Sequence, residues 1–516
     1  MIPGLIDIHM HIESSMMTPG PFCQRLAACG VTTIVSEPHE IANVHGLEVI
    51  RAMIAAGEDS PINVYYGIPS SAPSTSSEFE TTGSTIGMEE MVALLKENKV
   101  ICVGEIMNYR QIIQDNDLPI TEFLTYLRDH KPHFVIDGHC PSLVDLDLAK
   151  FLYLGINADH TEHSLEEIKQ RFENGMFVEL QEKTLKPEIF DYIQQNNLYE
   201  HFGFVTDDCM ADVLQEKGHL NVIVQQAISL GMRPEDAIYN ATYTNTRRMN
   251  LTDRGVLAPG RLADFCLVDD LNSLHMTAVY KNGQAICQEN TLLNIPASTY
   301  HFPKEFYQSV QLRSLNQSNF IIEVPEAFNE VTVKIMEIND GSTKITAKTA
   351  TIPVQNHVLQ WESSPYLLAA VFECHGKNQN IGYGFVTGDC IKTGAVATTY
   401  FHDHHNLCVI GKDIDSMMLA ANRVIALQGG IVTVEAGKIE AELALPVSGI
   451  LSDCSVDEIG TALKLVRNHL TKLGYRHYNP IMSLCTLGLP VSPELKLTNK
   501  GPINVKTGTI EKLYTI

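Results

Sequence analysis

The fold can be predicted outward from residues 4–13, Gly4-Leu5-Ile6-Asp7-Ile8-His9-Met10-His11-Ile12-Glu13. Its short apolar run is typical of a fully buried strand. Successive side chains of a strand alternate between two faces, so His9 and His11 point to the same side near the strand's carboxyl end. Two imidazoles aimed at one point suit a divalent metal, although a pair of structural, hydrogen-bonded histidines at a strand edge gives the same pattern.

The composition indicates a folded, acidic protein. Of 516 residues, 44% are hydrophobic and 19% charged, and the formal net charge is −24. This length supports two or three domains with hydrophobic cores. The negative charge argues against nucleic acid or an anionic membrane as a partner and favours a small, uncharged substrate. We expect a cytoplasmic protein, because the chain has no 18-residue apolar run, no signal-peptide pattern and no close pair among its twelve cysteines.

Short β-type runs alternate with amphipathic helical segments over about the first 205 residues. Apolar residues at helical spacing separate several of these runs, as in Met88–Lys99 and Ser164–Asn174. Eight strands alternating with helices predict a parallel (β/α)8 barrel. A doubly wound open sheet is the alternative, but it would place a glycine-rich turn where the His-x-His lies. The expected strands are residues 5–11, 32–37, 62–68, 100–106, 133–139, 155–160, 176–180 and 203–207.

Residues that bind metals or transfer protons follow most of these runs. In a barrel of this kind, catalytic residues lie at the carboxyl ends of the strands. A single histidine there is more often structural, but the combination predicts a metal-dependent active site. The candidates are His9, His11, Glu37, His39, Glu40, Glu105, Asp137, His139, Asp159, His160, Asp207 and Asp208.

Nearly the whole chain resembles the adenine deaminases, a family within the amidohydrolase superfamily. Its most specific segments are HMHIESSMMTP at residues 9–19, PHEIANV at 38–44 and HDHHN at 402–406. The His-x-His and the TDD at 206–208 belong to the wider superfamily. The resemblance implies an amidohydrolase-type TIM barrel, a purine base as substrate, and hydrolytic deamination of adenine to hypoxanthine and ammonia.

The resemblance also implies roles for the strand-end residues. It implies two divalent metal ions, manganese first, with iron(II) or zinc as alternatives. Glu105 would bridge the metals, where many superfamily members carry a carboxylated lysine, and a metal-bridged hydroxide would attack C6 of the purine. Asp207 would contact metal and act as the general base and acid. The implied ligands are His9, His11, Glu105, His139, His160 and Asp207.

Four further residues are candidates beside this set. Glu13 either supports the histidine pair or binds substrate, although Ser14 and Ser15 next to it also suit a helix cap. We assign His39 to the substrate, with a hydrogen bond within its loop as the alternative. Glu216 is predicted to contact the base and His219 to take part in proton transfer. The alternative for His219 is a structural histidine at a helix N-terminus.

The remaining chain predicts two further units. We expect the barrel to span 1–254, the remnant of a small β-sandwich domain to span 255–298, and a C-terminal mixed α/β domain to span 299–516. In the superfamily, strands before the barrel complete the small domain, whereas Met1 stands just before Pro3. Three explanations for the missing strands remain open: a mis-assigned start, a truncation compensated by assembly, and a decayed paralogue. We expect a homo-oligomer, because unpaired strand edges tend to associate.

The C-terminal part contains two patterns of interest. Alternation predicts strands at 320–324 and 331–335. The run His402-Asp403-His404-His405-Asn406 either binds metal or approaches the active site, or it forms a polar loop packed against the barrel. The family usually has serine where His404 stands.

Three departures concern the substrate more than the chemistry, and one of them is Thr161, which stands after His160 where the family usually has glutamate. The segment Glu179–Thr184 replaces an Arg-Glu-Gly-Ser type run, and Glu373–Gly376 replaces a Glu-Arg-Tyr-Gly type run. The alternatives to an adenine deaminase are therefore an amidohydrolase that acts on another aminopurine or a cyclic amide, and a catalytically weak paralogue. Glu105 argues against a cyclic-amide hydrolase of the dihydroorotase type, which has lysine there.

Overall fold

Eight parallel strands form the barrel in the computed structural model, which describes residues 1–516 except 115–117, 294–299, 326–327 and 516. Five of them form one parallel sheet in the order β2-β3-β4-β5-β6, and three form a second sheet in the order β7-β8-β9. The amide of Asp207 donates to His9 O at 3.1 Å, which joins the chain after β9 to β2. The strands are β2 (Leu5–Met10), β3 (Val31–Ser36), β4 (Asn63–Ile68), β5 (Val100–Val103), β6 (Val135–Ile136), β7 (Ala158–Asp159), β8 (Phe177–Leu180) and β9 (Phe202–Phe204).

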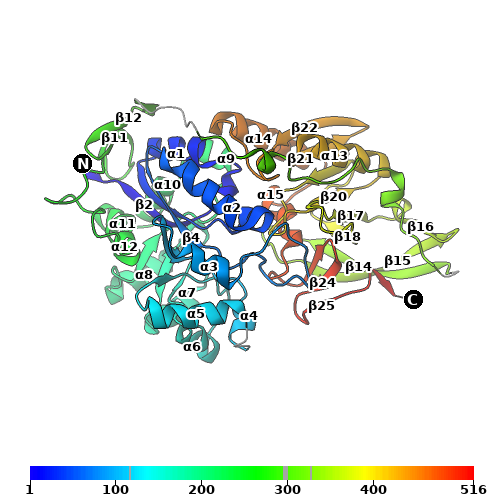
Figure 1. Cartoon of the computed structure of the whole chain (residues 1–516), viewed down its shortest axis with the longest axis horizontal. Helices are drawn as coiled ribbons and strands as arrows, with labels where there is room; N and C mark the ends of the chain where they lie inside the picture. The colour runs from blue at the N-terminus through cyan, green and yellow to red at the C-terminus, as the bar shows by residue number, and fades with distance from the viewer. Residues whose placement is uncertain (115–117, 294–299, 326–327, 516) are drawn as a thin grey trace.

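Helices surround these strands (Figure 1). Local sequence explains where they begin: Ser164 caps α7 by accepting a hydrogen bond from the amide of Glu167, and Pro119 occupies the first position of α5. No described helix is both long and apolar enough to cross a membrane. The barrel helices are α1 (Pro19–Ala28), α2 (His39–Glu58), α3 (Met88–Leu94), α4 (Tyr109–Ile112), α5 (Pro119–His130), α6 (Asp145–Tyr153), α7 (Leu165–Glu173), α8 (Pro187–Asn196), α9 (Ala211–Glu216), α10 (Leu220–Ser229), α11 (Pro234–Asn240) and α12 (Tyr243–Arg248).

A small antiparallel sheet lies beside the barrel at the N-terminal end of the molecule (Figure 1). Ile2 pairs with Cys266 and Pro3 with Phe265, so the first residues of the chain form its edge. The expected boundary at 298/299 lies outside the described residues. The sheet contains β1 (Ile2–Pro3), β10 (Phe265–Val268), β11 (Met276–Lys281), β12 (Gln284–Gln288) and β13 (Thr291–Leu292).

A second lobe, at the opposite end of Figure 1, is built on a large mixed sheet. The prediction of a strand at 320–324 was wrong. A 3-10 helix, η4 (Gln317–Phe320), precedes an isolated bridge at Glu323. Asn316 caps this helix, because its side chain accepts a hydrogen bond from the amide of Ser318. The sheet strands are β14 (Glu330–Ile338), β15 (Thr346–Gln355), β16 (Val358–Leu359), β17 (Leu367–Phe372), β18 (Ile381–Gly388), β19 (Ala395–Thr398), β20 (Leu407–Gly411), β21 (Gly430–Glu435), β22 (Lys438–Ala444) and β26 (Tyr514–Thr515).

Three helices and a small sheet complete the second lobe, which packs against the barrel. Arg467 of α14 pairs with Asp212 of α9, with 2.7 Å between Nε and Oδ2. Asn406, the last residue of the loop between β19 and β20, donates to Thr81 O at 2.8 Å. These contacts hold that loop at the barrel. The elements are α13 (Ile414–Leu427), α14 (Val456–Lys472), α15 (Pro480–Cys485), β23 (Leu495–Thr498), β24 (Gly501–Asn504) and β25 (Thr509–Ile510).

Candidate active site

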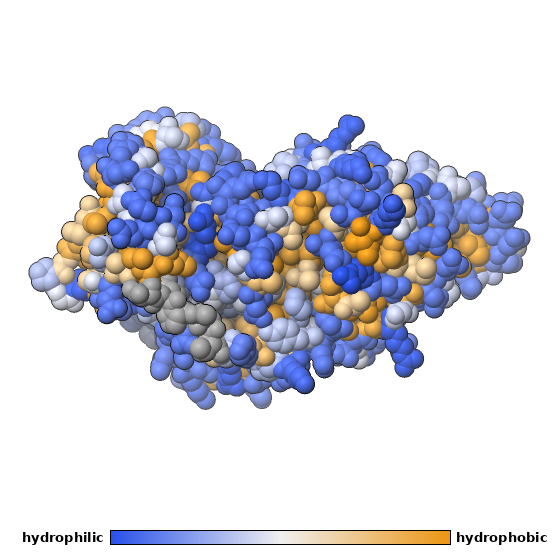
Figure 2. Space-filling model, turned by 90° about the horizontal axis from the view of Figure 1, so that it is seen from above, coloured by the Kyte–Doolittle hydropathy of each residue, from blue (hydrophilic) through white to orange (hydrophobic). Residues whose placement is uncertain are grey.

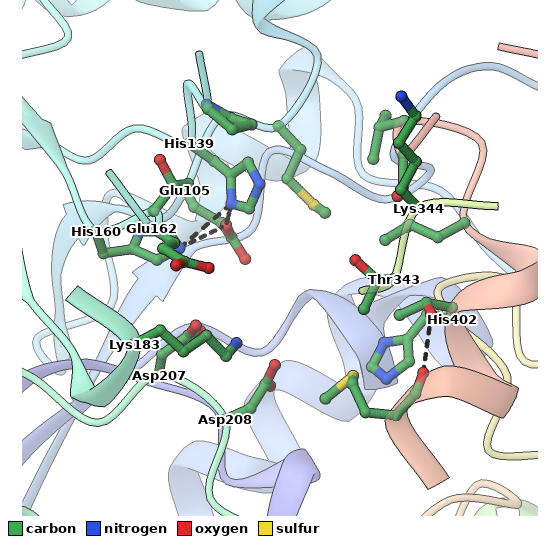
Figure 3. A pocket seen from close by; sticks show the side chains of 18 of the residues that line it. Glu105, His139, His160, Glu162, Lys183, Asp207, Asp208, Thr343, Lys344 and His402 are labelled. Carbon is green, nitrogen blue, oxygen red and sulfur yellow. Dashed lines mark hydrogen bonds and ion pairs between the residues drawn. The ribbon is translucent and has the colours of Figure 1, made fainter. Parts of the chain in front are cut away.

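A cavity of about 460 Å³ lies between the barrel and the second lobe. Figure 3 shows barrel residues, including Glu105 and Asp207, on one side, and Thr343, Lys344 and His402 on the other. We call these sides the barrel wall and the opposite wall. The barrel wall includes His11, His39, Glu105, His139, His160 and Asp207, and the opposite wall includes Thr343, Lys344, His402, Asp403, Tyr478 and Pro493.

His9 of β2 and His11, directly after that strand, are both buried, and His11 lines the cavity. His9 Nδ1 lies 2.6 Å from Asp137 Oδ2, and the His9 ring stacks on His160 with 3.7 Å between centroids. His11 Nε2 lies 3.4 Å from Glu105 Oε1, while its Nδ1 lies 2.9 Å from the backbone oxygen of Glu37. That second contact fixes the ring so that Nε2 faces the carboxylates.

Glu105 occupies the centre of the constellation. One carboxylate oxygen faces His11, whereas the other lies 2.6 Å from His139 Nδ1 and 3.4 Å from His160 Nε2. Burial opposes ionisation, yet the three imidazoles, His139 first, hold the pKa of Glu105 well below its ordinary value. A charged carboxylate that faces histidines on both sides has the arrangement of a bridging ligand.

Asp207 completes the barrel wall from the chain after β9. Its backbone is left-handed, with φ of 59°, and its Oδ1 lies 3.6 Å from His11 Nε2. Gln181, which follows β8, donates to Asp207 Oδ2 at 2.9 Å and to the backbone oxygen of His160 at 3.0 Å. Gln181 thereby fixes one carboxylate oxygen and leaves the other facing His11.

The donor set fits divalent cations. Several buried polar atoms here have no hydrogen-bond partner within the described ranges of the chain, among them His9 Nε2, His160 Nδ1 and both carboxylate oxygens of Glu179. Buried polar groups are rarely left unpaired unless they bind an ion or water. Imidazoles with carboxylates are ligands for Mn, Fe(II) or Zn. The described residues contain four groups of ligand atoms that all lie within 4.8 Å of one another: His9, Asp137, His160 and Glu179; His11, Glu37, His39 and Glu105; His9, His11 and Asp207; and Glu105, His139 and His160.

Of the four further candidates, the structure brings only His39 to the cavity. Glu216 is exposed and forms an ion pair with Lys464 of α14. Its closeness in sequence to Asp207 suggested a role at the site, but α9 directs its side chain toward the second lobe.

His219 and Glu13 are buried behind the cavity lining. His219 Nε2 lies 3.2 Å from Thr206 Oγ1, and burial lowers the pKa of His219 to about 3, so its ring is neutral. Glu13 Oε1 accepts from the amide of Ile41 at 3.5 Å. The side chains of His219 and Glu13 therefore make structural contacts and do not line the cavity.

Several residues of the site were given no individual role from the sequence. Asp137 and Glu179 flank His9, and their signal was their position at the ends of β6 and β8. Gln181 and Lys183 line the cavity from the atypical segment after β8. Asp403 reaches the cavity from the second lobe, and its only signal was the polar run around it.

Family models and curated relatives match the chain over both lobes. The amidohydrolase family model matches residues 1–286, and the adenine deaminase C-terminal domain model matches residues 343–509. Adenine deaminase of Clostridium perfringens strain 13 is 45% identical over all of this chain and 90% of its own length. Adenine deaminase 2 of Shouchella clausii strain KSM-K16 is also 45% identical, over all of this chain and 89% of its own. A crystal structure of β-aspartyl dipeptidase from Fervidobacterium islandicum AW-1 matches with a TM-score of 0.44 at 18% identity, over 57% of this chain and 85% of that chain.

Proposed function

The chain belongs to the adenine deaminase family of amidohydrolases, and on that premise we propose that it catalyses the hydrolytic deamination of adenine to hypoxanthine and ammonia. One observation carries this proposal. At the base of the cavity, the Glu105 carboxylate lies between His11 on one side and His139 with His160 on the other. This arrangement suits a pair of metal ions that share one carboxylate.

We propose that two divalent cations occupy this constellation, with manganese as the first expectation. When bound, such a pair supplies a water of lowered pKa and polarises the bond under attack. The unpartnered buried atoms of His9 and His160 support this occupancy. The proposed ligands are His9, His11, Glu105, His139, His160 and Asp207.

The side chains of the barrel wall would then perform the proton transfers. The side chains of His11, His160 and Lys183 hold the pKa of Asp207 well below its ordinary value despite burial, so Asp207 is charged and can accept a proton from water. The same carboxylate can return that proton to the amino group at C6, so that ammonia leaves. The hydrogen bond from Gln181 keeps Asp207 in one orientation during both transfers.

We also propose a setting for the enzyme: the cytoplasm, in the salvage of purine bases, as a homo-oligomer. All twelve cysteines are free, which supports a reducing compartment. Apolar patches interrupt the hydrophilic surface of the face in Figure 2, and such patches support association. The proposed units are 1–254, 255–298 and 299–516. A single-chain mass in solution would contradict the oligomer.

The test is ammonia release from adenine by the purified chain loaded with Mn(II), with metal counted on the same sample. We expect release together with about two metals per chain. Two metals without release would reject adenine as the substrate, and a panel of aminopurines and cyclic amides would then identify the class. A sample that contains no metal and releases no ammonia would favour a silent paralogue.

A further inference from the structure

Asp403 brings a carboxylate of the second lobe to the cavity. It lies in the loop between β19 and β20, lines the cavity, and is buried. Its Oδ1 lies 3.3 Å from His402 Nδ1 and 3.8 Å from His39 Nε2. Its Oδ2 makes no hydrogen bond to any part of the chain that the structure describes. A buried carboxylate oxygen without a partner is costly, so this atom is available to a donor that enters the cavity.

The charge of Asp403 fixes the kind of partner it takes. Burial opposes ionisation, but His39 and His402 hold the pKa of Asp403 well below its ordinary value. An ionised carboxylate only accepts hydrogen bonds, so the missing partner is an N–H or O–H group. Its contacts with His39 and His402 keep the carboxylate in one orientation.

The gap between the carboxylates of Glu105 and Asp403 is spanned by one small ring, the imidazole of His39. His39 lies between the two carboxylates: its Nδ1 is 3.8 Å from Glu105 Oε1, and its Nε2 is 3.8 Å from Asp403 Oδ1. A planar base placed beside the His39 ring therefore reaches from the metal ligands to Asp403. With C6 of adenine at the barrel wall, N9 lies at the far end of the purine, and in free adenine N9 carries a hydrogen.

We propose that Asp403 accepts the N9–H of the purine and thereby selects free bases over N9-substituted purines such as nucleosides. This inference rests on the proposed deaminase function and adds a recognition residue from the second lobe. A substituent on N9 removes the donor and places an apolar or sugar group against a buried charge. A site built to pair a substrate N–H discriminates strongly against an analogue that lacks it.

Neighbouring residues hold the loop that carries Asp403 in place. Glu40 Oε2 lies 3.5 Å from both His402 Nδ1 and His405 Nε2, so the N-terminus of α2 anchors the loop. His404 is buried but does not line the cavity; its Nδ1 accepts from the amide of Asn406 at 3.2 Å. His404 therefore serves as a matched control, one residue away in the same loop.

The experiment compares adenine with 9-methyladenine. Metal-loaded wild type, Asp403→Ala, Asp403→Asn and His404→Ser are assayed for kcat/KM on both substrates. We expect wild type to prefer adenine by about 10³-fold or more. Asp403→Ala should lower kcat/KM for adenine by about 10²-fold or more, change 9-methyladenine by less than about fivefold, and keep the metal content. Asp403→Asn retains one acceptor oxygen and should lose less, whereas His404→Ser should keep the wild-type preference.

Several outcomes would overturn the proposal. An equal fall on both substrates would make Asp403 merely structural, and an unchanged preference would exclude it from recognition. A third metal equivalent in wild type that disappears in Asp403→Ala would assign the carboxylate to a cation.

Equilibrium binding by calorimetry separates this proposal from the proposed reaction. If wild type releases no ammonia, the deaminase function fails, but binding of adenine against 9-methyladenine still tests Asp403. A binding preference that Asp403→Ala abolishes supports the recognition role. Equal binding of the two bases by wild type, or binding of neither, overturns it.

Discussion

The two walls of the cavity are built in different ways. The barrel wall comes from strand ends, where a few backbone positions of a regular fold direct ligand atoms to one point. The opposite wall comes from the loop between β19 and β20 and from neighbouring segments of the second lobe, which long-range packing holds against the barrel. We infer a division of labour, in which the barrel wall performs the chemistry and the opposite wall recognises the base.

The largest effect should follow from removing the shared carboxylate. Glu105→Ala takes away the carboxylate that faces His11, His139 and His160. We expect loss of at least one metal equivalent and a fall in kcat/KM of about 10⁵-fold or more. Metal analysis and an ammonia assay measure both. A full metal count in this variant would defeat the bridging role.

The next effect concerns proton transfer at the barrel wall. Asp207→Asn keeps the shape of the side chain but cannot accept the proton from water, so turnover should fall by about 10³- to 10⁴-fold. The circular dichroism spectrum should be unchanged, because the backbone contact between Asp207 N and His9 O remains. Wild-type kcat in this variant would remove Asp207 as the base.

A smaller effect is expected from the support of the opposite wall. Lys496 is fully buried, and its Nζ donates to the backbone oxygens of Thr343 at 3.2 Å and Thr486 at 2.7 Å, both residues of the cavity lining. Lys496→Met leaves those carbonyls unpaired, at about 1–3 kcal/mol each. We expect KM for adenine to rise about tenfold with metal content unchanged. Lost metal with unchanged KM would contradict the division of labour.

The smallest effect concerns stability, behind the barrel wall. Burial lowers the pKa of His219 to about 3, below the ordinary 6.5, so the unfolded chain binds a proton there between pH 6.5 and 3 and the folded chain does not. Stability therefore falls as pH drops through this window, by about 1.4 kcal/mol per pH unit from this group. His219→Gln removes the titration and should reduce the loss in thermal midpoint between pH 7 and 5.5. An equal loss in both proteins would contradict this account.

Sequence reasoning succeeded where local rules determine the structure. All eight predicted barrel strands exist, because short apolar runs bounded by polar residues define buried strands, and their carboxyl ends carry the ligand-type residues. The strand predicted from alternation at 320–324 does not form, because the cap formed by Asn316 favours a 3-10 turn. Local features of the fold could therefore be predicted from the sequence alone.

Contacts between the lobes lay beyond those rules. Asp403 and His39 are more than 350 residues apart, so their contact depends on how the second lobe packs. The same packing turns Glu216 toward Lys464 and away from the cavity. Proximity in sequence to Asp207 pointed to Glu216 and His219, neither of which lines the cavity, whereas no partner for Asp403 could be predicted from the sequence.

The most direct measurement is a crystal structure of the manganese-loaded protein with hypoxanthine, the proposed product. We expect two anomalous scattering peaks among the barrel-wall ligands, C6 of the base facing them, and N9 within about 3.2 Å of Asp403 Oδ2. A base bound with N9 toward Glu105, or metal peaks at Asp403 in place of the barrel wall, would contradict the division of labour between the two walls.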